Sequence, residues 1–163
     1  MTRALLALSA ALLAGCGFHL RGTAVLPFDT IYLPATTAPG IVLDLRRNIL
    51  AGTKTRVVDD PKKAEAVMEF TQEARDKVIL SLGADGRVRE YELRYRVGFR
   101  VRDPKGGEFV PTSTVQLQRD VTFNDSAVLS KEIEDQQLYR DMQSDMVRQI
   151  MARLAAAERP KTQ

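Results

Sequence analysis

Residues 90–102 place the strongest constraint on the fold, because apolar and charged side chains alternate along them. A β-strand points successive side chains to opposite faces of its sheet. The segment therefore predicts a strand of about 40 Å, at about 3.4 Å per residue, with one face in the core. The apolar face consists of Tyr91, Leu93, Tyr95, Val97, Phe99 and Val101, and the opposite face of Glu90, Glu92, Arg94, Arg96, Arg100 and Arg102, with only Gly98 interrupting the charged row.

Three further strands are predicted around this one. Residues 66–82 read as one long or bent strand, and the Asp85-Gly86 pair that follows is a strong hairpin signal. Residues 114–123 come after a glycine-rich turn and form the next antiparallel strand, while residues 28–33 form a short strand. Residues 55–58 are compatible with a brief additional strand.

Two segments, residues 41–51 and residues 129–154, repeat apolar residues at helical spacing. Because the sheet has one apolar face, we expect both helices to cover that face. The sequence thus predicts an α+β fold, a two-layer sandwich with a four-stranded antiparallel sheet (a mixed edge is left open) and two helices on one face, in the order β-α-β-β-β-α. Met142, Met146 and Met151 fit the core stripe of the second helix better than a soft-ligand set.

The N-terminal residues have the pattern of a lipoprotein signal peptide. Arg3 precedes an apolar run, residues 4–14, that is shorter than the roughly 20 residues a membrane-spanning helix needs. Leu13-Ala14-Gly15-Cys16 resembles the bacterial lipobox, and this resemblance implies cleavage before Cys16, N-acylation and an S-diacylglycerol group on Cys16. The alternative is an ordinary signal peptide that contains a cysteine. Gly17, where inner-membrane lipoproteins tend to have aspartate, implies sorting to the outer membrane.

These features divide the chain into four parts. We predict a signal peptide at residues 1–15, a lipid-anchored extended lead at residues 16–27, one α+β domain at residues 28–157 and a tail at residues 158–163. Arg3 is the only charged residue among residues 1–15. Without these residues the chain has 23 Lys and Arg against 21 Asp and Glu. A charge balance this even argues against a nucleic-acid partner.

Catalysis and metal binding are not expected in this chain. It has one cysteine and one histidine, His19, which lies three residues from the predicted anchor. A histidine-based triad or a metal cluster in the folded domain is therefore not expected, and the sequence has neither a Walker A loop nor a G-x-G-x-x-G motif. We expect no enzymatic activity and no cofactor other than the covalent lipid on Cys16.

The charged face of the central strand has two interpretations. A row of arginines suits an anionic partner, because the guanidinium group binds phosphate in a bidentate manner. Alternatively, the row is a solvated face that Glu90, Glu92 and acids on neighbouring strands neutralise. The pattern alone leaves both interpretations open for Arg94, Arg96, Arg100 and Arg102.

Several segments together resemble the LptE family of LPS-assembly lipoproteins. They are Gly15-Cys16-Gly17-Phe18-His19-Leu20-Arg21-Gly22, the hairpin from Leu80-Ser81-Leu82 through Asp85-Gly86-Arg87 to Glu90-Tyr91-Glu92-Leu93-Arg94-Tyr95, and Leu129-Ser130-Lys131-Glu132 before the terminal helix. The resemblance implies a protein of the Gram-negative outer membrane that plugs the lumen of the β-barrel LptD from the periplasmic side and helps the barrel assemble. It also implies a part in lipopolysaccharide transport and insertion, with direct binding of lipopolysaccharide.

The resemblance assigns a lipopolysaccharide-binding role to Lys131, which matches a lysine of the family near the start of the last helix. A second basic residue of the family falls at Ala84, so this chain departs from the pattern there. Arg87 and Arg89, just past the turn, are candidates to replace it. The remaining alternative is another outer-membrane lipoprotein, an auxiliary subunit or a cell-wall-binding module that does not bind lipopolysaccharide.

Replacing the predicted lipid-bearing residue tests the signal-peptide interpretation. The substitution Cys16→Ala should leave an unprocessed precursor in the inner membrane, because the lipobox loses the residue that is modified. Membrane fractionation and the mass of the protein measure this outcome. Normally matured Cys16→Ala protein in the outer-membrane fraction would contradict the lipoprotein interpretation.

Overall fold

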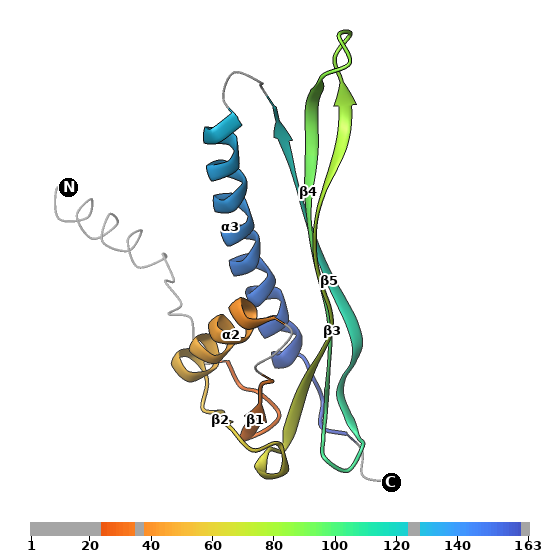
Figure 1. The fold of residues 1–163 in the computed structure, drawn as a ribbon. Coiled ribbons are helices and arrows are strands. Elements are labelled where there is room, and N and C mark those ends of the chain that lie inside the picture. Colours follow the sequence, from red (N-terminus) through yellow and green to blue (C-terminus); the bar gives the residue numbers. More distant parts are fainter. Residues whose placement is uncertain (1–23, 35–37, 124–127, 161–163) are drawn as a thin grey trace, which may run out of the picture.

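The computed structural model describes residues 24–34, 38–123 and 128–160, and the predicted signal peptide and Cys16 lie outside these ranges. Five strands and two long helices make up the fold (Figure 1). Their order is β1 (Thr30–Tyr32), α2 (Pro39–Gly52), β2 (Arg56–Val58), a 3-10 turn (Pro61–Lys63), β3 (Ala66–Leu82), β4 (Val88–Arg102), β5 (Glu108–Thr122) and α3 (Val128–Ala155). The predicted α+β class and the placement of both helices on one side of the sheet are confirmed (Figure 1).

The sheet has the strand order β2-β1-β3-β4-β5, so the predicted four-stranded antiparallel sheet is one strand short, and the mixed edge that the sequence left open is present. β2 is a fifth strand, and β1 pairs in parallel with both β2 and β3. A parallel pair needs a crossover connection, which α2 supplies between β1 and β2. Strands of three residues are too short to show a period of two, which is why the sequence only hinted at β2.

The predicted apolar face of β4 forms the centre of the core. All six of its inward side chains are buried, and Leu93, Tyr95, Val97, Phe99 and Val101 have no exposed surface. α2 covers this layer with four apolar residues one helical turn or less apart, namely Ile41, Val42, Leu45 and Ile49. α3 adds a second stripe, Met142, Met146, Val147, Ile150 and Leu154, which confirms that Met142 and Met146 are core residues.

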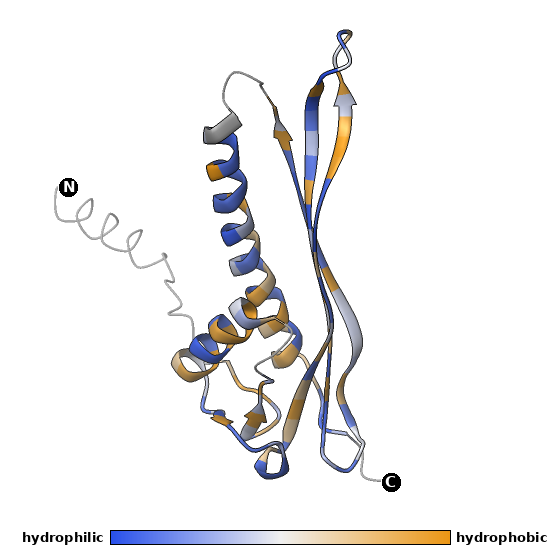
Figure 2. Cartoon of the chain, viewed as in Figure 1, coloured by the Kyte–Doolittle hydropathy of each residue, from blue (hydrophilic) through white to orange (hydrophobic). Residues whose placement is uncertain are grey.

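The molecule is elongated, and its two ends differ. α2, β1 and β2 lie at one end, and the turn between β3 and β4 lies at the other (Figure 1). The buried apolar residues of α3 begin at Met142, whereas its preceding residues, 130–141, are half-buried or exposed. Figure 2 shows the same change, with the first half of α3 mostly blue and its second half more orange. The apolar core therefore fills the α2 end, and the hairpin end is held by other contacts.

At Thr71 the alternation of side chains along β3 shifts by one residue. Beyond this point, a different set of β3 side chains faces the helices. Phe70 pairs with Phe99 and Gln72 pairs with Gly98, so Thr71 is an extra residue that forms a β-bulge. A Cβ atom on Gly98 would lie 2.5 Å from Thr71 Oγ1. The glycine that interrupts the charged row of β4 is thus the residue that leaves room for the bulge.

Adding one methyl group at Gly98 tests this contact. The substitution Gly98→Ala should lower the free energy of unfolding by about 1–3 kcal/mol, the usual cost of overpacking a filled site. Gly52→Ala is the matched control, because a Cβ atom there meets nothing within 4 Å and alanine favours the helix. Urea denaturation measures the free energy of unfolding of both variants. Equal values for the two variants would show that Thr71 does not clash with a Cβ atom at position 98.

Candidate functional site: the hairpin end of the sheet

A tight turn closes the hairpin of β3 and β4. The Gly83 amide donates to the Arg87 carbonyl at 2.7 Å, and the Gly86 amide donates to the Gly83 carbonyl at 2.9 Å. Gly86 has a φ of 76°, which L side chains rarely adopt. Asp85 Oδ1 accepts a bond from the Arg87 amide at 3.2 Å. The Asp85-Gly86 signal therefore gave the turn correctly, and the turn sets Arg87 and Arg89 at the start of the return strand.

The predicted basic residues lie towards one end of the molecule. The hairpin turn and the first turn of α3 point the same way, and the hairpin reaches beyond the helix (Figure 1). Arg87 is largely exposed and lies 3.7 Å from Asp85, and Arg89 is also exposed. Lys131 is 22% exposed and pairs with Glu134 at 2.7 Å. Arg87 and Arg89 line one concave surface that does not include Lys131, so both the shared basic surface and the binding role of the three residues stay predictions.

Exposed apolar side chains accompany these cations. Ile79, Leu80 and Leu82 are about half exposed or more, and Ile133 on α3 is 61% exposed. Both arginines and Leu82 share a concave surface, which is lined by Ser81, Leu82, Ala84, Asp85, Arg87, Val88, Arg89, Glu90, Thr122 and Phe123. Sequence reasoning missed this apolar group, although the uncharged run from Val78 to Leu82 was its signal. The hairpin end thus presents apolar and cationic groups together.

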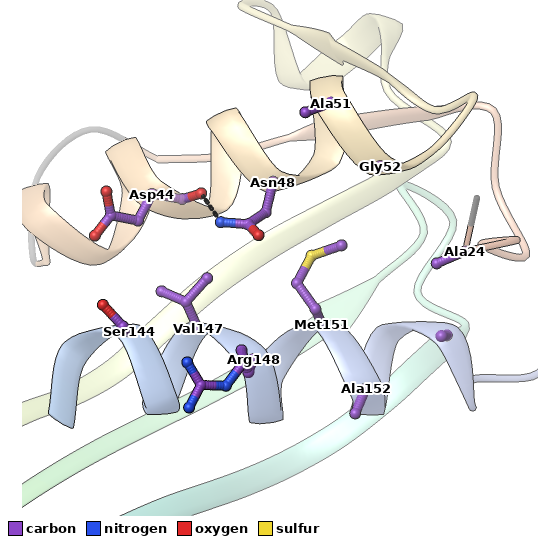
Figure 3. Close-up of a pocket in the computed structure, with 11 residues that line it drawn as sticks. Ala24, Asp44, Asn48, Ala51, Gly52, Ser144, Val147, Arg148, Met151 and Ala152 are labelled. Atoms are coloured by element: carbon purple, nitrogen blue, oxygen red, sulfur yellow. Dashed lines mark hydrogen bonds between the residues drawn. The ribbon is translucent and has the colours of Figure 1, made fainter. Parts of the chain in front are cut away.

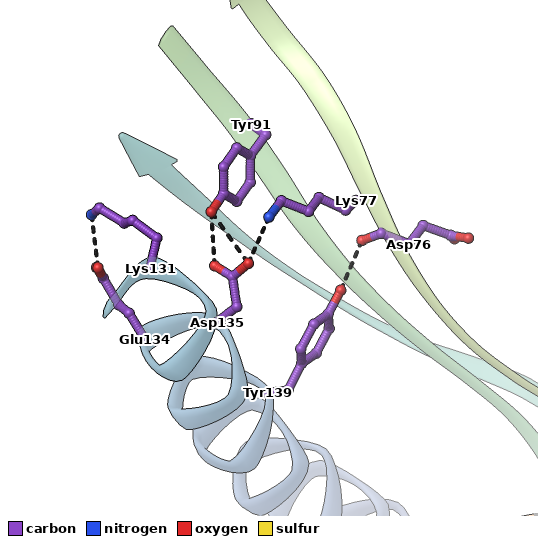
Figure 4. A network of polar contacts seen from close by, with 7 residues as sticks. All are labelled: Asp76, Lys77, Tyr91, Lys131, Glu134, Asp135 and Tyr139. Atoms are coloured by element: carbon purple, nitrogen blue, oxygen red, sulfur yellow. Dashed lines mark hydrogen bonds and ion pairs between the residues drawn. The ribbon is translucent and has the colours of Figure 1, made fainter. Parts of the chain in front are cut away.

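A polar network holds the first half of α3 to the hairpin (Figure 4). Asp135 accepts from Lys77 Nζ at 2.6 Å and from the Tyr91 hydroxyl at 3.0 Å. The Tyr139 hydroxyl donates to the backbone carbonyl of Asp76 at 3.0 Å. Burial lowers the pKa of the Lys77 ammonium, but its bonds to Asp135 and Tyr91 outweigh burial, so the net pKa lies above the ordinary value of 10.5. Lys77 therefore stays charged and keeps Asp135 paired.

A second set of polar contacts links the sheet to both helices below this network. The buried Tyr95 hydroxyl donates to Glu73 at 2.7 Å and accepts from Arg75 at 3.1 Å. Burial raises the pKa of Tyr95 to about 12. Arg75 also donates to Gln143 Oε1 at 3.2 Å, and Gln143 Nε2 donates to Asp44 on α2 at 2.7 Å. β3, α3 and α2 are therefore joined by one chain of hydrogen bonds.

The arginine row on the outer face of the sheet is neutralised by neighbouring acids. Arg100 and Arg102 both pair with Glu69, at 2.6 and 2.5 Å. Arg96 pairs with Asp76 at 2.7 Å, and Arg94 pairs with Glu92 on its own strand. Hydrogen bonding from Arg100 lowers the pKa of the Glu69 carboxyl below its ordinary value of 4.5. The solvated, balanced interpretation of this face is thus the one that the structure supports.

A groove with a volume of about 630 Å³ lies between α2 and α3 (Figure 3). Its lining combines small residues with a few polar ones, namely Ala24, Asp44, Asn48, Ala51, Gly52, Ser144, Val147, Arg148, Met151, Ala152 and Ala155. No histidine or cysteine lines it, and the described residues hold no group of ligands suited to a metal ion.

The acid–base behaviour of Glu69 gives a measurable prediction. Since its pKa is lower in the folded state, the stability it contributes is complete above pH 4.5 and is lost as the pH falls through the lowered value. Glu69→Gln should cost about 0.5–2 kcal/mol at neutral pH, from two partly exposed ion pairs. This difference from the unsubstituted protein should shrink on acidification.

Chemical denaturation over a pH series measures this effect. Glu158→Gln is the control, because Glu158 is exposed and forms none of the ion pairs found in the described part of the chain. A pH-independent difference for Glu69→Gln would show that the carboxyl acts by packing alone.

The sequence is similar to that of a known protein family. The LptE family profile, described as lipopolysaccharide-assembly, matches residues 28–154. Proteins called LPS-assembly lipoprotein LptE are similar: that of Photorhabdus laumondii is 26% identical over 98% of this chain and 87% of its own length, and that of Pectobacterium atrosepticum is 29% identical over 91% and 82%.

Solved structures of two lipoproteins resemble the fold of this chain. An uncharacterized lipoprotein B from Nitrosomonas europaea has a TM-score of 0.70 and 40% identity over 83% of this chain and 88% of its own. A minor lipoprotein from Acinetobacter baumannii shares the fold, with a TM-score of 0.66 and 20% identity over 84% and 99%. Since the family profile spans most of the described domain, this chain belongs to the LptE family of non-enzymatic lipopolysaccharide-assembly lipoproteins.

Proposed function

We propose that this protein is anchored to the outer membrane by lipid on Cys16, plugs the LptD barrel and binds lipopolysaccharide during its insertion into the outer leaflet. The family assignment supports a role in lipopolysaccharide assembly, and the relatives with that name are lipoproteins. None of the helices in the described ranges is long and apolar enough to cross a bilayer. An anchor at Cys16 would hold the domain at the periplasmic side of the membrane.

The character of the outer face of the sheet supports the proposed role as a barrel plug. The interior of an outer-membrane barrel is polar, so a plug needs a polar and charge-balanced surface. The ion pairs of β3 and β4 provide such a surface, and β5 extends it with Thr114, Gln116 and Gln118 in register with outward residues of β4. These strands would meet a polar wall with most of their arginines already paired with acids.

The proposal that lipopolysaccharide is bound rests on the groups at the hairpin end. An amphiphile with phosphates and acyl chains needs cationic and apolar groups close together. Arg87 and Arg89 lie beside the exposed Leu82, and Lys131 occupies the helix start at the same end. This juxtaposition of charge and apolar surface is the observation on which the binding role depends.

One set of observations favours a plug that does not bind lipopolysaccharide. Lys131 pairs with Glu134, Arg87 lies near Asp85, and Ala84 stands where the family has a basic residue. Each local acid lowers the attraction of its cation for phosphate. A test must therefore separate lipopolysaccharide binding from association with the barrel.

Charge reversal at the hairpin end provides that separation. Arg87→Asp combined with Lys131→Asp should weaken lipopolysaccharide binding about tenfold, if each exposed contact contributes about 0.7 kcal/mol. Lys62→Asp combined with Lys105→Asp is the matched control, because it changes the net charge equally at the opposite end. Binding should also weaken as salt rises, because exposed charges are screened over about 8–10 Å.

Both double variants should still co-purify with the barrel. Unchanged lipopolysaccharide affinity in the folded hairpin variant would reject the binding role and leave the plug. Failure of the unsubstituted protein to co-purify with an outer-membrane barrel would reject the plug and favour another lipoprotein function.

A further inference from the structure

The exposed apolar side chains of the described residues form two groups rather than a scatter. One group lies at the hairpin end, and the other consists of Val25, Leu43 and Leu50, which are 82, 49 and 60% exposed. Leu43 and Leu50 belong to α2, which already buries four apolar residues in the core. Positions seven apart lie on one side of a helix, so both leucines share the side opposite the core. α2 is therefore apolar on two sides, and only one of them is covered by the protein.

The chain enters the fold beside this uncovered side. The Ala24 amide donates to the Gly52 carbonyl at 2.8 Å, which ties the start of the described chain to the end of α2. Eight residue steps separate Cys16 from Ala24, and they span about 29 Å at most, at 3.3–3.6 Å per residue. This chain length limits the predicted lipid anchor to within about 29 Å of Ala24.

The charges around the uncovered side suit an anionic surface. Arg47 lies between the two leucines on the helix and its side chain is 69% exposed. From Pro39 to Asp60 the chain carries four cations, Arg46, Arg47, Lys54 and Arg56, against three acids, Asp44, Asp59 and Asp60. Arg46 pairs with Asp59 at 3.0 Å and Arg47 lies 3.6 Å from Asp44, which leaves a small positive excess. An amphipathic surface with leucines in the middle and basic residues around them is typical of helices that lie in the headgroup region of a bilayer.

We infer that the outward side of α2, formed by Leu43, Arg47 and Leu50 with Val25 next to its end, lies on the phospholipid surface that holds the acyl chains of Cys16. The inference rests on the proposed lipidation of Cys16. The anchor brings α2 to the surface, and α2 then fixes the orientation of the domain on it. The hairpin end, at the far end of the molecule (Figure 1), points away from the contact.

Depth-dependent quenching of a fluorescent label tests this orientation. The full lipidated protein is used, with the lipid on Cys16 verified by mass, in vesicles of phosphatidylethanolamine and phosphatidylglycerol. Cys16 is the only cysteine, and its sulfur is blocked by the lipid, so Leu50→Cys gives a single labelling position. Gln116→Cys, exposed on β5 on the other side of the sheet, is the reference position.

Nitroxide-bearing lipids should quench the label at position 50 severalfold more than the label at position 116. Adding Leu43→Ser should reduce the quenching at position 50, whereas adding Leu82→Ser, a similarly exposed leucine at the hairpin end, should not. Equal quenching at positions 50 and 116, or no response to Leu43→Ser, would overturn the inference.

The vesicles contain neither lipopolysaccharide nor a barrel, so this result is independent of those parts of the proposed function. Absence of lipid on Cys16 would overturn the inference together with the proposed anchor.

Discussion

The β-bulge at Thr71 determines which side chains the long hairpin turns towards α3. Without the extra residue, strict alternation from Met68 would send Ala74 and Asp76 inward and leave Arg75 and Lys77 in solvent. With it, the inward side of β3 is apolar before the bulge and charged beyond it. The division of the molecule into an apolar half and a polar half follows from this one register shift.

The polar half is held by contacts of a different kind from those of the core. Apolar burial does not depend on direction, whereas Asp135 and Tyr139 must each meet a particular donor or acceptor on the hairpin. Such contacts exchange with water at little net cost, so this half of α3 opens more easily than the half that begins at Met142. The end proposed to meet a ligand is thus also the end with the lower local stability.

Alternation along residues 90–102 was enough to predict β4, its buried face and the class of the fold, because a period of two over so long a segment has one structural meaning. The Asp85-Gly86 turn was equally readable. β2 was only hinted at because three residues show no period, and the bulge was missed because its evidence lies on another strand, at Gly98. For the candidate site, sequence identified the basic residues, but the partners Glu134 and Asp85 and the exposed leucines became apparent only from the structure.

The edge of β3 has a consequence for how the chain reaches its folded state. β1 pairs with β3 only at Ala66 and Val67, so along the rest of β3 no described strand covers that edge. Tyr139 occupies part of the edge by bonding the Asp76 carbonyl, and it belongs to α3, which is synthesised last. Until α3 docks, a newly made chain presents an uncovered edge that ends in the uncharged run from Val78 to Leu82, a sequence of the kind that pairs with other chains.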